Sequence, residues 1–227
     1  MKSLLEFLNQ KGLIIDRLDI IEEAFTHTSF VNENKNIQND NERLELLGDA
    51  VLQLYVSDFL FQYTPSLSEG EMTSLRSRLV NEKTLAAITR RCDLFNFLKL
   101  GVGEEKTGGR NRDSLLADVF EAFVAALYLQ QDKGNVKKFL DPLIIPEFKN
   151  MLQQEHDDYK TRLQEYVQSD TRKTVVYELI KSMGPSNAPT FEVVVKLDDL
   201  VLGKGKGSSK KQAEQNAAKD AFTKLVR

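Results

Sequence analysis

Three carboxylates share one face of a predicted helix in the first quarter of the chain. Glu42, Glu45 and Asp49 lie in the segment 41–54 (NERLELLGDAVLQL). At 100° per residue they fall within about 60° of one another. The predicted core stripe on the far side consists of Leu44, Leu47, Val51 and Leu54. Because like charges one turn apart repel, we expect a cation, such as a bound metal ion, to offset them.

A second acidic helix face is predicted over 114–129 (SLLADVFEAFVAALYL), where Ser114 can cap the helix. Asp118 and Glu121 lie about 60° apart on one side of this helix. The predicted core stripe on the opposite side consists of Phe120, Phe123, Val124 and Leu127. The neighbours of the two acids are small residues, which leaves room for a ligand. A solvated charged face is the alternative interpretation.

Side-by-side packing of these two helices would bring four carboxylates together. The four are Glu45, Asp49, Asp118 and Glu121. Oxygen ligands suit hard divalent cations such as Mg²⁺ or Mn²⁺, and carboxylate-bound magnesium normally acts on phosphate substrates. A di-iron carboxylate bundle would need a Glu-x-x-His pair on two helices, but the chain contains only His27 and His156. We expect His27 to be a hydrogen-bonded structural residue.

Composition sets the outer limits of this interpretation. With 227 residues and 41% hydrophobic content, the chain can form one large or two modest domains. It lacks an apolar run of the roughly 18 residues that span a membrane and a cleavable leader, so we expect a cytoplasmic protein without membrane contact. The lone Cys92 fits a reducing compartment and a structural role.

Charge is divided unevenly along the chain. Residues 157–227 hold 13 Lys/Arg against 10 Asp/Glu, which leaves 18 against 24 for residues 1–156. The two parts therefore carry charges of +3 and −6. Such asymmetry is a weak indication that the basic part faces nucleic acid.

Hydrophobic periodicity and turn residues predict the remaining organisation. Helices are expected over 3–9, 18–25, 71–81, 82–98 and 114–129, and loops over 32–41, 64–70 and 101–112. Pro142 and Pro146 bracket an apolar stretch that ends in a short helix. The wholly polar segment 153–158 (QQEHDD) indicates a linker. The predicted domains are therefore 1–152 and 159–227, joined by residues 153–158.

The second domain has the predicted order α-β-β-β-α. Its expected elements are helix 159–168, strands 175–179, 191–197 and 200–202, and helix 208–226. The predicted buried stripe of the last helix consists of Ala213, Ala217, Ala221 and Leu225.

Four lysines precede and open that last helix. Lys204, Lys206, Lys210 and Lys211 lie within eight residues that include no acid. Lysines in a first helical turn oppose the helix dipole, so they favour a bound anion there; a solvated loop is the alternative. This topology with phosphate contacts fits double-stranded RNA that is recognised by shape. The absence of Trp argues against a stacking platform for single strands.

These motifs together resemble a known family. NERLELLGDAVL resembles the signature of the ribonuclease III family, SLLADVFEAFVAALYL resembles its second acidic motif, and residues 157–227 resemble a double-stranded RNA-binding domain. The resemblance implies an all-α endonuclease domain followed by a small α+β RNA-binding domain. It also implies that Glu45, Asp49, Asp118 and Glu121 are catalytic acids that bind Mg²⁺, with Mn²⁺ as a substitute, and that no organic cofactor is needed.

The resemblance implies a reaction and partners as well. A water attacks the phosphodiester of each strand and leaves 5′ phosphates and 3′ hydroxyls with short 3′ overhangs. Because one chain supplies one four-acid site, cutting both strands implies a homodimer. Ribosomal RNA precursors and other structured transcripts are the implied substrates.

Further residues are carried over by position. The accessory acids are Glu42 and Glu69; the minor-groove contacts are Thr161, Gln164 and Glu165; the phosphate contacts are Lys206, Lys210 and Lys211. Two positions depart from the family. Leu46 stands where many members have a Phe that enters the partner subunit's pocket, and Asn187 stands where a histidine often reaches the minor groove.

Two other classes of function are compatible with parts of the sequence. A non-catalytic duplex-RNA binder would be expected to have lost metal ligands, but all four acids are present. A carboxylate-bridged redox metalloprotein would leave the lysine-rich domain without a role.

Overall fold

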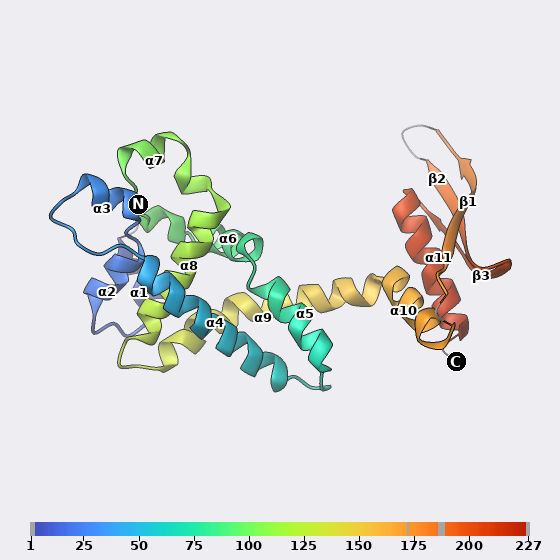
Figure 1. Ribbon diagram of the computed structural model, residues 1–227, viewed down its shortest axis with the longest axis horizontal. Coiled ribbons are helices and arrows are strands. Elements are labelled where there is room, and N and C mark those ends of the chain that lie inside the picture. Colours follow the sequence, from blue (N-terminus) through green and yellow to red (C-terminus); the bar gives the residue numbers. More distant parts are fainter. Residues whose placement is uncertain (1–2, 172, 186–188, 226–227) are drawn as a thin grey trace. The chain divides into compact units, whose positions relative to one another are not determined.

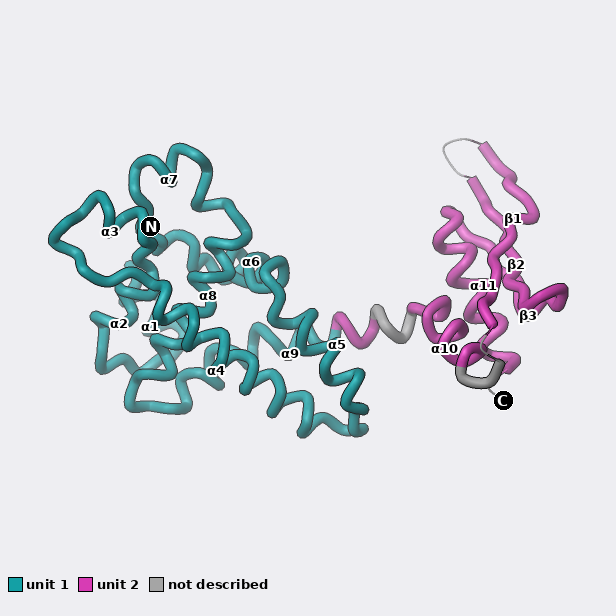
Figure 2. Tube along the Cα trace, viewed as in Figure 1, with its two compact units in different colours: residues 1–149 teal, residues 150–227 magenta. Residues whose placement is uncertain are grey.

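The computed structural model describes residues 3–171, 173–185 and 189–225, with backbone only at 154–157 and 169–171. The chain forms two compact units, residues 1–149 and residues 150–227 (Figure 2). The elements that begin in the first unit are α1 Leu4–Gln10, α2 Leu18–Ala24, α3 Thr28–Glu33, α4 Glu42–Phe61, α5 Glu69–Leu79, α6 Glu82–Arg91, α7 Val102–Lys106, α8 Asp113–Tyr128 and α9 Gly134–Asp157 (Figure 1). Short 3₁₀ turns occur at Leu94–Phe97 and Gly109–Asn111. The second unit contains α10 Tyr159–Thr171, β1 Val176–Met183, β2 Thr190–Leu197, β3 Leu200–Gly207 and α11 Lys210–Leu225.

Helix α8 is the centre of the helical unit. Its predicted core stripe is confirmed, since Phe120, Phe123, Val124 and Leu127 are fully buried. The ring of Phe123 also packs 5.0–6.4 Å from the rings of Phe7, Phe25 and Phe139. Helix α8 is buried on nearly all sides, as expected for a helix that is apolar around most of its circumference. The small residues beside its acids are part of this core, and Ser114 does not cap the helix, which begins after Arg112.

Helix α4 packs on a different stripe from the predicted one. Leu44, Gly48, Leu52, Val56 and Leu60 are buried along it. Leu54, which the sequence placed in the core, is 72% exposed. The buried residues follow one i, i+4 row, and this row passes through a glycine that hydrophobicity does not mark. The sequence therefore did not predict which face of α4 is buried against its neighbours.

Capping interactions explain two helix boundaries that were predicted wrongly. Helix α5 begins at Glu69 rather than at 71, because Ser68 and Glu71 form a capping box. The predicted loop 101–112 contains α7, whose first N–H groups donate to the carboxylate of Glu33. That cap comes from a residue distant in sequence, so local composition could not reveal it.

The segment after α8 is a single helix rather than an apolar stretch with a short helix at its end. Helix α9 contains both Pro142 and Pro146. Burial of Leu140, Ile144 and Phe148 offsets the cost of proline within a helix. The predicted linker 153–158 is helical as far as Asp157, and α10 begins at Tyr159.

The second unit confirms the predicted α-β-β-β-α order. Its three strands form an antiparallel sheet in the order β1-β2-β3, with irregular register between Leu179 and Lys181 and after Val195. The core between this sheet and the helices α10 and α11 contains Leu163, Val193, Val195 and the alanines 213, 217, 218 and 221. Leu225 was predicted to be buried with these alanines, but it is 37% exposed.

Strand β3 extends further than predicted, from Leu200 to Gly207. In this strand Gly203 and Gly205 face α11 so closely that a Cβ atom on either would overlap the backbone around Ala217. The pattern G-K-G-K-G is therefore a period-two strand pattern in which glycine takes the inward position. Lys204 and Lys206 consequently lie on the strand rather than in a loop.

Two expected structural roles agree with the structure. The Nδ1 atom of His27 accepts a hydrogen bond from the Ser29 N–H and begins α3. Cys92 is buried, and its burial raises the pKa of the thiol to about 11. Within the described ranges, no helix is both long enough and apolar enough to span a membrane.

Candidate active site

Close contact between α4 and α8 positions the acidic residues. At Gly48 of α4, an added Cβ atom would overlap the carbonyl oxygen of Glu121 in α8 and stand 3.1 Å from its Cα atom. Only glycine allows the two backbones to approach this closely. Glu45 and Asp49 flank Gly48 along α4, so the crossing point brings both of them beside the acids of α8.

The electrostatic coupling among the acids confirms that they lie near one another. Glu45, Asp49, Asp118 and Glu121 are all partly buried. Burial, followed by the charges of Asp49, Glu45 and Asp118, raises the pKa of Glu121 to about 8. Burial and the charge of Glu45 likewise raise the pKa of Asp118 to about 6. Both carboxyl groups therefore lose their protons less readily than an exposed carboxyl group does.

The acids of α4 also repel one another. Burial raises the pKa of Glu45, and the charges of Glu42 and Asp49 raise it further. The four predicted acids thus form one group in which each additional negative charge is resisted by the others. Such a set of carboxylates favours a cation as its partner.

Asp49 differs from the other acids in its hydrogen bonding. The Nε2 atom of Gln53, one turn later on α4, lies 2.8 and 2.9 Å from the two carboxylate oxygens of Asp49. In the described part of the chain, no side chain donates a hydrogen bond to Glu45, Asp118 or Glu121. Gln53 was not among the predicted site residues, although its i, i+4 spacing from Asp49 would have indicated this hydrogen bond.

The accessory acids are placed differently from one another. Glu42 is exposed in the first turn of α4, and its charge acts on Glu45. Glu69 is the first residue of α5, where its Oε1 atom accepts a hydrogen bond from the Thr73 hydroxyl at 3.1 Å. Glu82, in the first turn of α6, was not predicted, yet its charge contributes to the raised pKa of Asp118.

The donor chemistry of the site fits a hard divalent cation. All four groups are carboxylates, and the raised pKa values of Glu45, Asp118 and Glu121 indicate that positive charge would be favourable there. Their side chains do not form a closed coordination shell, because among the described residues no group of three or more His, Cys, Asp or Glu is arranged to hold a metal ion. The four carboxylates are thus suitable ligands, but their oxygen atoms would have to move closer together to bind one ion.

The lysines of the second unit fall into paired and unpaired sets. Lys160, Lys173, Lys196, Lys206 and Lys224 each form an ion pair with a carboxylate. Lys206 of β3 pairs with Glu192 of β2 at 3.6 Å. Lys210 and Lys211 are exposed in the first turn of α11, and within the described residues neither has an acidic partner.

The residues predicted to reach a minor groove differ in whether their side chains already form hydrogen bonds within the protein. Gln164 of α10 accepts a hydrogen bond from the Val175 N–H and donates one to the Lys173 carbonyl, so it joins α10 to the segment before β1. The Thr161 hydroxyl donates to Asp158 at 2.9 Å. Glu165 is exposed. Asn187 lies outside the described residues.

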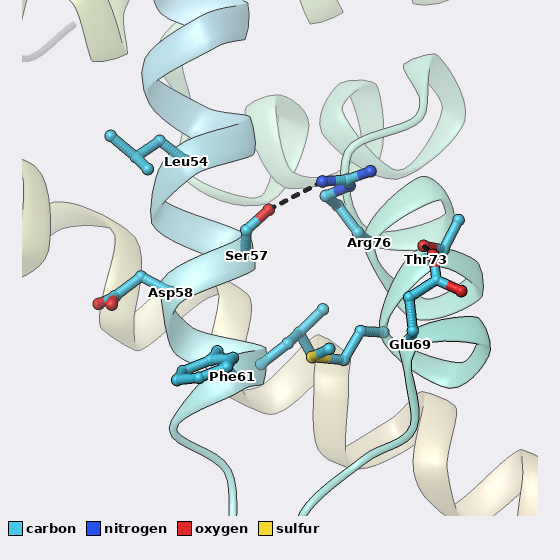
Figure 3. A pocket seen from close by; sticks show the side chains of 9 residues that line it. Leu54, Ser57, Asp58, Phe61, Glu69, Thr73 and Arg76 are labelled. Carbon is cyan, nitrogen blue, oxygen red and sulfur yellow. Dashed lines mark hydrogen bonds between the residues drawn. The ribbon is translucent and has the colours of Figure 1, made fainter.

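A groove lies between the C-terminal half of α4 and α5 (Figure 3). It has a volume of about 440 Å³ and is lined by Leu54, Ser57, Asp58, Leu60, Phe61, Glu69, Met72, Thr73 and Arg76. In Figure 3 the Arg76 guanidinium donates to the Ser57 hydroxyl across this groove, at 3.0 Å. Leu46, Leu54 and Phe61 of the same helix are 77%, 72% and 77% exposed. Helix α4 therefore carries acidic residues in its N-terminal half and exposed apolar residues at Leu46, Leu54 and Phe61.

Comparison with known proteins agrees with both units. The ribonuclease-III-like family model matches residues 18–148, and the double-stranded RNA binding motif matches residues 159–225. Ribonuclease 3 of Streptococcus gordonii is 46% identical over 226 residues, which cover 99% of this chain and 97% of that protein. Ribonuclease 3 of Streptococcus pyogenes is 45% identical and covers 99% of both chains.

A solved structure agrees with the fold of the helical unit. The nuclease domain of ribonuclease III from Campylobacter jejuni matches with a TM-score of 0.58 and 33% identity, over 65% of this chain and 99% of that one. The two sequence motifs, the two-unit architecture and these relatives lead to one conclusion. The chain belongs to the ribonuclease III family of double-strand-specific endoribonucleases.

Proposed function

We propose that this chain is a divalent-metal-dependent endoribonuclease that cleaves both strands of duplex RNA. The approach of α4 to α8 at Gly48 is the observation that carries the proposal. It brings together acids whose raised pKa values indicate a site suited to a cation. Mg²⁺ is the proposed ion, with Mn²⁺ as a substitute, because both prefer oxygen ligands.

The four acids would hold the ion and take up its charge. A divalent cation in such a site lowers the pKa of a water and offsets charge on a phosphate. The carboxylates of Glu45 and Asp49 approach from α4, and those of Asp118 and Glu121 approach from α8. Glu121 must lose its proton to serve as an anionic ligand, so binding should favour higher pH. Glu42 and Glu82 would add negative potential at the edge of the site.

The second unit would hold the duplex. Lys210 and Lys211 have no acidic partner in the described residues and stand at the amino end of α11, where phosphate is also favoured by backbone N–H groups. Exposed Glu165 and Thr161 would reach a minor groove from α10. The engaged side chain of Gln164 would contribute mainly by supporting this surface.

A homodimer would supply one site for each strand. Leu46, Leu54 and Phe61 lie within about 80° of one another around α4, so their exposed side chains form one apolar face. The related Campylobacter jejuni structure is described as having a flexible region involved in dimer formation. We infer that the α4 face and the neighbouring groove form the subunit contact here, with Leu46 as a contact residue (Figure 3).

The finer points of the reaction follow from family membership. The products would carry 5′ phosphates and 3′ hydroxyls with short 3′ overhangs. Ribosomal RNA precursors and other structured transcripts would be the substrates, and the cytoplasm the compartment. The functional domains would be residues 1–152 and 159–227, joined by residues 153–158.

Replacement of Glu121 tests the catalytic assignment. In Glu121→Gln we expect Mg²⁺-dependent cleavage of a long perfect duplex to be lost, while binding of the duplex without metal remains. Asp113→Asn is a matched control on the same helix, because Asp113 pairs with Arg90 outside the acidic group. Simultaneous loss of cleavage and binding in Glu121→Gln would contradict the assignment.

Mapping of the product ends tests the direction of attack. Digestion of the same duplex with and without Mg²⁺ should give 5′ phosphates only when the metal is present. Products with 3′ phosphates would exclude water attack of the proposed polarity. A functional protein that contains tightly bound iron would favour the redox alternative.

A further inference from the structure

Gln53 donates hydrogen bonds to Asp49, one of the proposed metal ligands. Its Nε2 atom lies 2.8 Å from Oδ1 and 2.9 Å from Oδ2 of Asp49, and both side chains are partly buried. The amide nitrogen of Gln53 thus donates hydrogen bonds to both carboxylate oxygens of Asp49. Because each carboxylate oxygen has two lone-pair sites, Asp49 can keep these bonds and still bind a cation.

A second Asp–Gln pair occurs at the C-terminal end of α4, in a different environment. The Nε2 atom of Gln62 lies 2.8 Å from both carboxylate oxygens of Asp58, again one turn apart, but that pair is exposed. An i, i+4 pair of Asp and Gln is therefore an ordinary feature of this helix. The Asp49–Gln53 pair differs from it because Asp49 lies near Glu45 and Glu121, and a role in metal binding would depend on these neighbours.

Those surroundings make the orientation of Asp49 costly to maintain. The charge of Asp49 is the largest charge effect on Glu121, and it also acts on Glu45. Repulsion of this kind favours rotation of the Asp49 carboxylate away from its neighbours and toward water. A hydrogen bond donor that is fixed on the same helix opposes this rotation.

We propose that Gln53 is a positioning residue that holds the Asp49 carboxylate in the orientation needed to bind the divalent cation. The inference rests on the proposed function, since it requires a metal ion at the four acids. Outer hydrogen bond partners of metal ligands commonly set affinity in this way, because they fix the ligand before the ion arrives. Gln53 itself touches neither the ion nor the RNA in this scheme.

The test compares Gln53→Met with Gln62→Met in the full chain. Both changes keep the side-chain length and remove the donor, and each removes one Asp–Gln pair from α4. Two quantities are measured against Mg²⁺ concentration: the unfolding temperature of the RNA-free protein and the cleavage rate with saturating duplex RNA. For Gln53→Met we expect both Mg²⁺ midpoints to rise about tenfold, with little loss of the maximal rate at saturating Mg²⁺.

Three outcomes decide the matter. A shift in Gln53→Met with Gln62→Met like the unsubstituted chain supports the positioning role. Unchanged midpoints in Gln53→Met, or equal shifts in both variants, overturn it, because the pair then acts only as a local helix contact. If the unsubstituted chain neither cleaves with Mg²⁺ nor gains stability from it, the proposed metal site itself fails and this inference fails with it.

Discussion

Gly48 of α4 lies against the backbone of Glu121 in α8, with no room for a side chain between them. The backbone of Glu121 therefore requires glycine at position 48, and this contact fixes where α4 places Glu45 and Asp49, two of the proposed metal-binding acids.

The first prediction concerns this contact. Gly48→Ala should force the helices apart and cost about 1–3 kcal/mol of stability, or more if the backbone cannot shift, with loss of cleavage. Gly70→Ala in α5 is the control, because nothing lies within 4 Å of an added Cβ atom there. Urea unfolding and a cleavage assay would measure both effects. Full activity in Gly48→Ala would show that the close approach is not required.

The second prediction concerns the pH dependence of the metal-free protein. The folded-state pKa values of Glu121 and Asp118, about 8 and about 6, exceed the ordinary values of 4.5 and 3.8. The folded state therefore binds more protons than the unfolded state in this window, and stability should fall as pH rises from about 4 to about 8.

Glu121→Gln isolates the contribution of one group to that decline. Above about pH 6 the variant should lose less stability than the unsubstituted chain, because its amide does not ionise. Urea unfolding of both proteins in chelator across this range gives the comparison. Parallel curves would contradict the raised pKa of Glu121.

The third prediction separates unpaired from paired lysines in RNA binding. Lys211→Gln should weaken duplex binding and reduce the slope of log affinity against log salt by about 1, since one phosphate contact is lost. Lys224 pairs with Asp220 on the same helix, so Lys224→Gln should leave the slope unchanged. Binding titrations over a range of salt concentrations would measure the slopes. Equal effects of the two changes would assign the effect to net charge alone.

The fourth prediction distinguishes support from contact in α10. Gln164→Ala removes two hydrogen bonds to the backbone near β1 and should cost about 1–3 kcal/mol of stability. Glu165→Ala, on the exposed face, should weaken duplex binding without a comparable change in stability. Thermal unfolding and RNA titration of each variant would separate the two roles. A stable Gln164→Ala protein with lost binding would make Gln164 a direct contact instead.

The fifth prediction concerns the subunit contact. Leu46→Glu places a charge on the exposed apolar face of α4 and should shift the chain toward monomer and reduce double-strand cleavage. Leu5→Glu, at another exposed apolar position on α1, is the control. Sedimentation analysis at several concentrations would give the association state. A monomeric unsubstituted chain that cuts both strands would contradict the homodimer.

The sequence predicted those features that local chemistry determines. The spacing of the acids on each helix predicted two acidic faces, which lie on α4 and α8 beside their contact at Gly48, and the alternation around Val193 and Val195 predicted the second strand. The α-β-β-β-α order followed from similar local patterns. For these features, the residue types and their spacing along the chain were sufficient to predict the structure.

Other features depend on partners that are distant in the sequence or on residues without side chains. Leu54 was assigned to the core because it is apolar, whereas the buried row of α4 passes through Gly48. The cap of α7 comes from Glu33, more than sixty residues earlier. Both errors have one origin, since tertiary contacts decided what local hydrophobicity could not.

The glycines of β3 have a consequence for how the RNA-binding unit can vary. Because Gly203 and Gly205 place the backbone of β3 directly against the backbone of α11, any larger residue at either position would push the helix away from this strand. The two glycines of β3 therefore help to determine where α11 places Lys210 and Lys211, the proposed phosphate contacts.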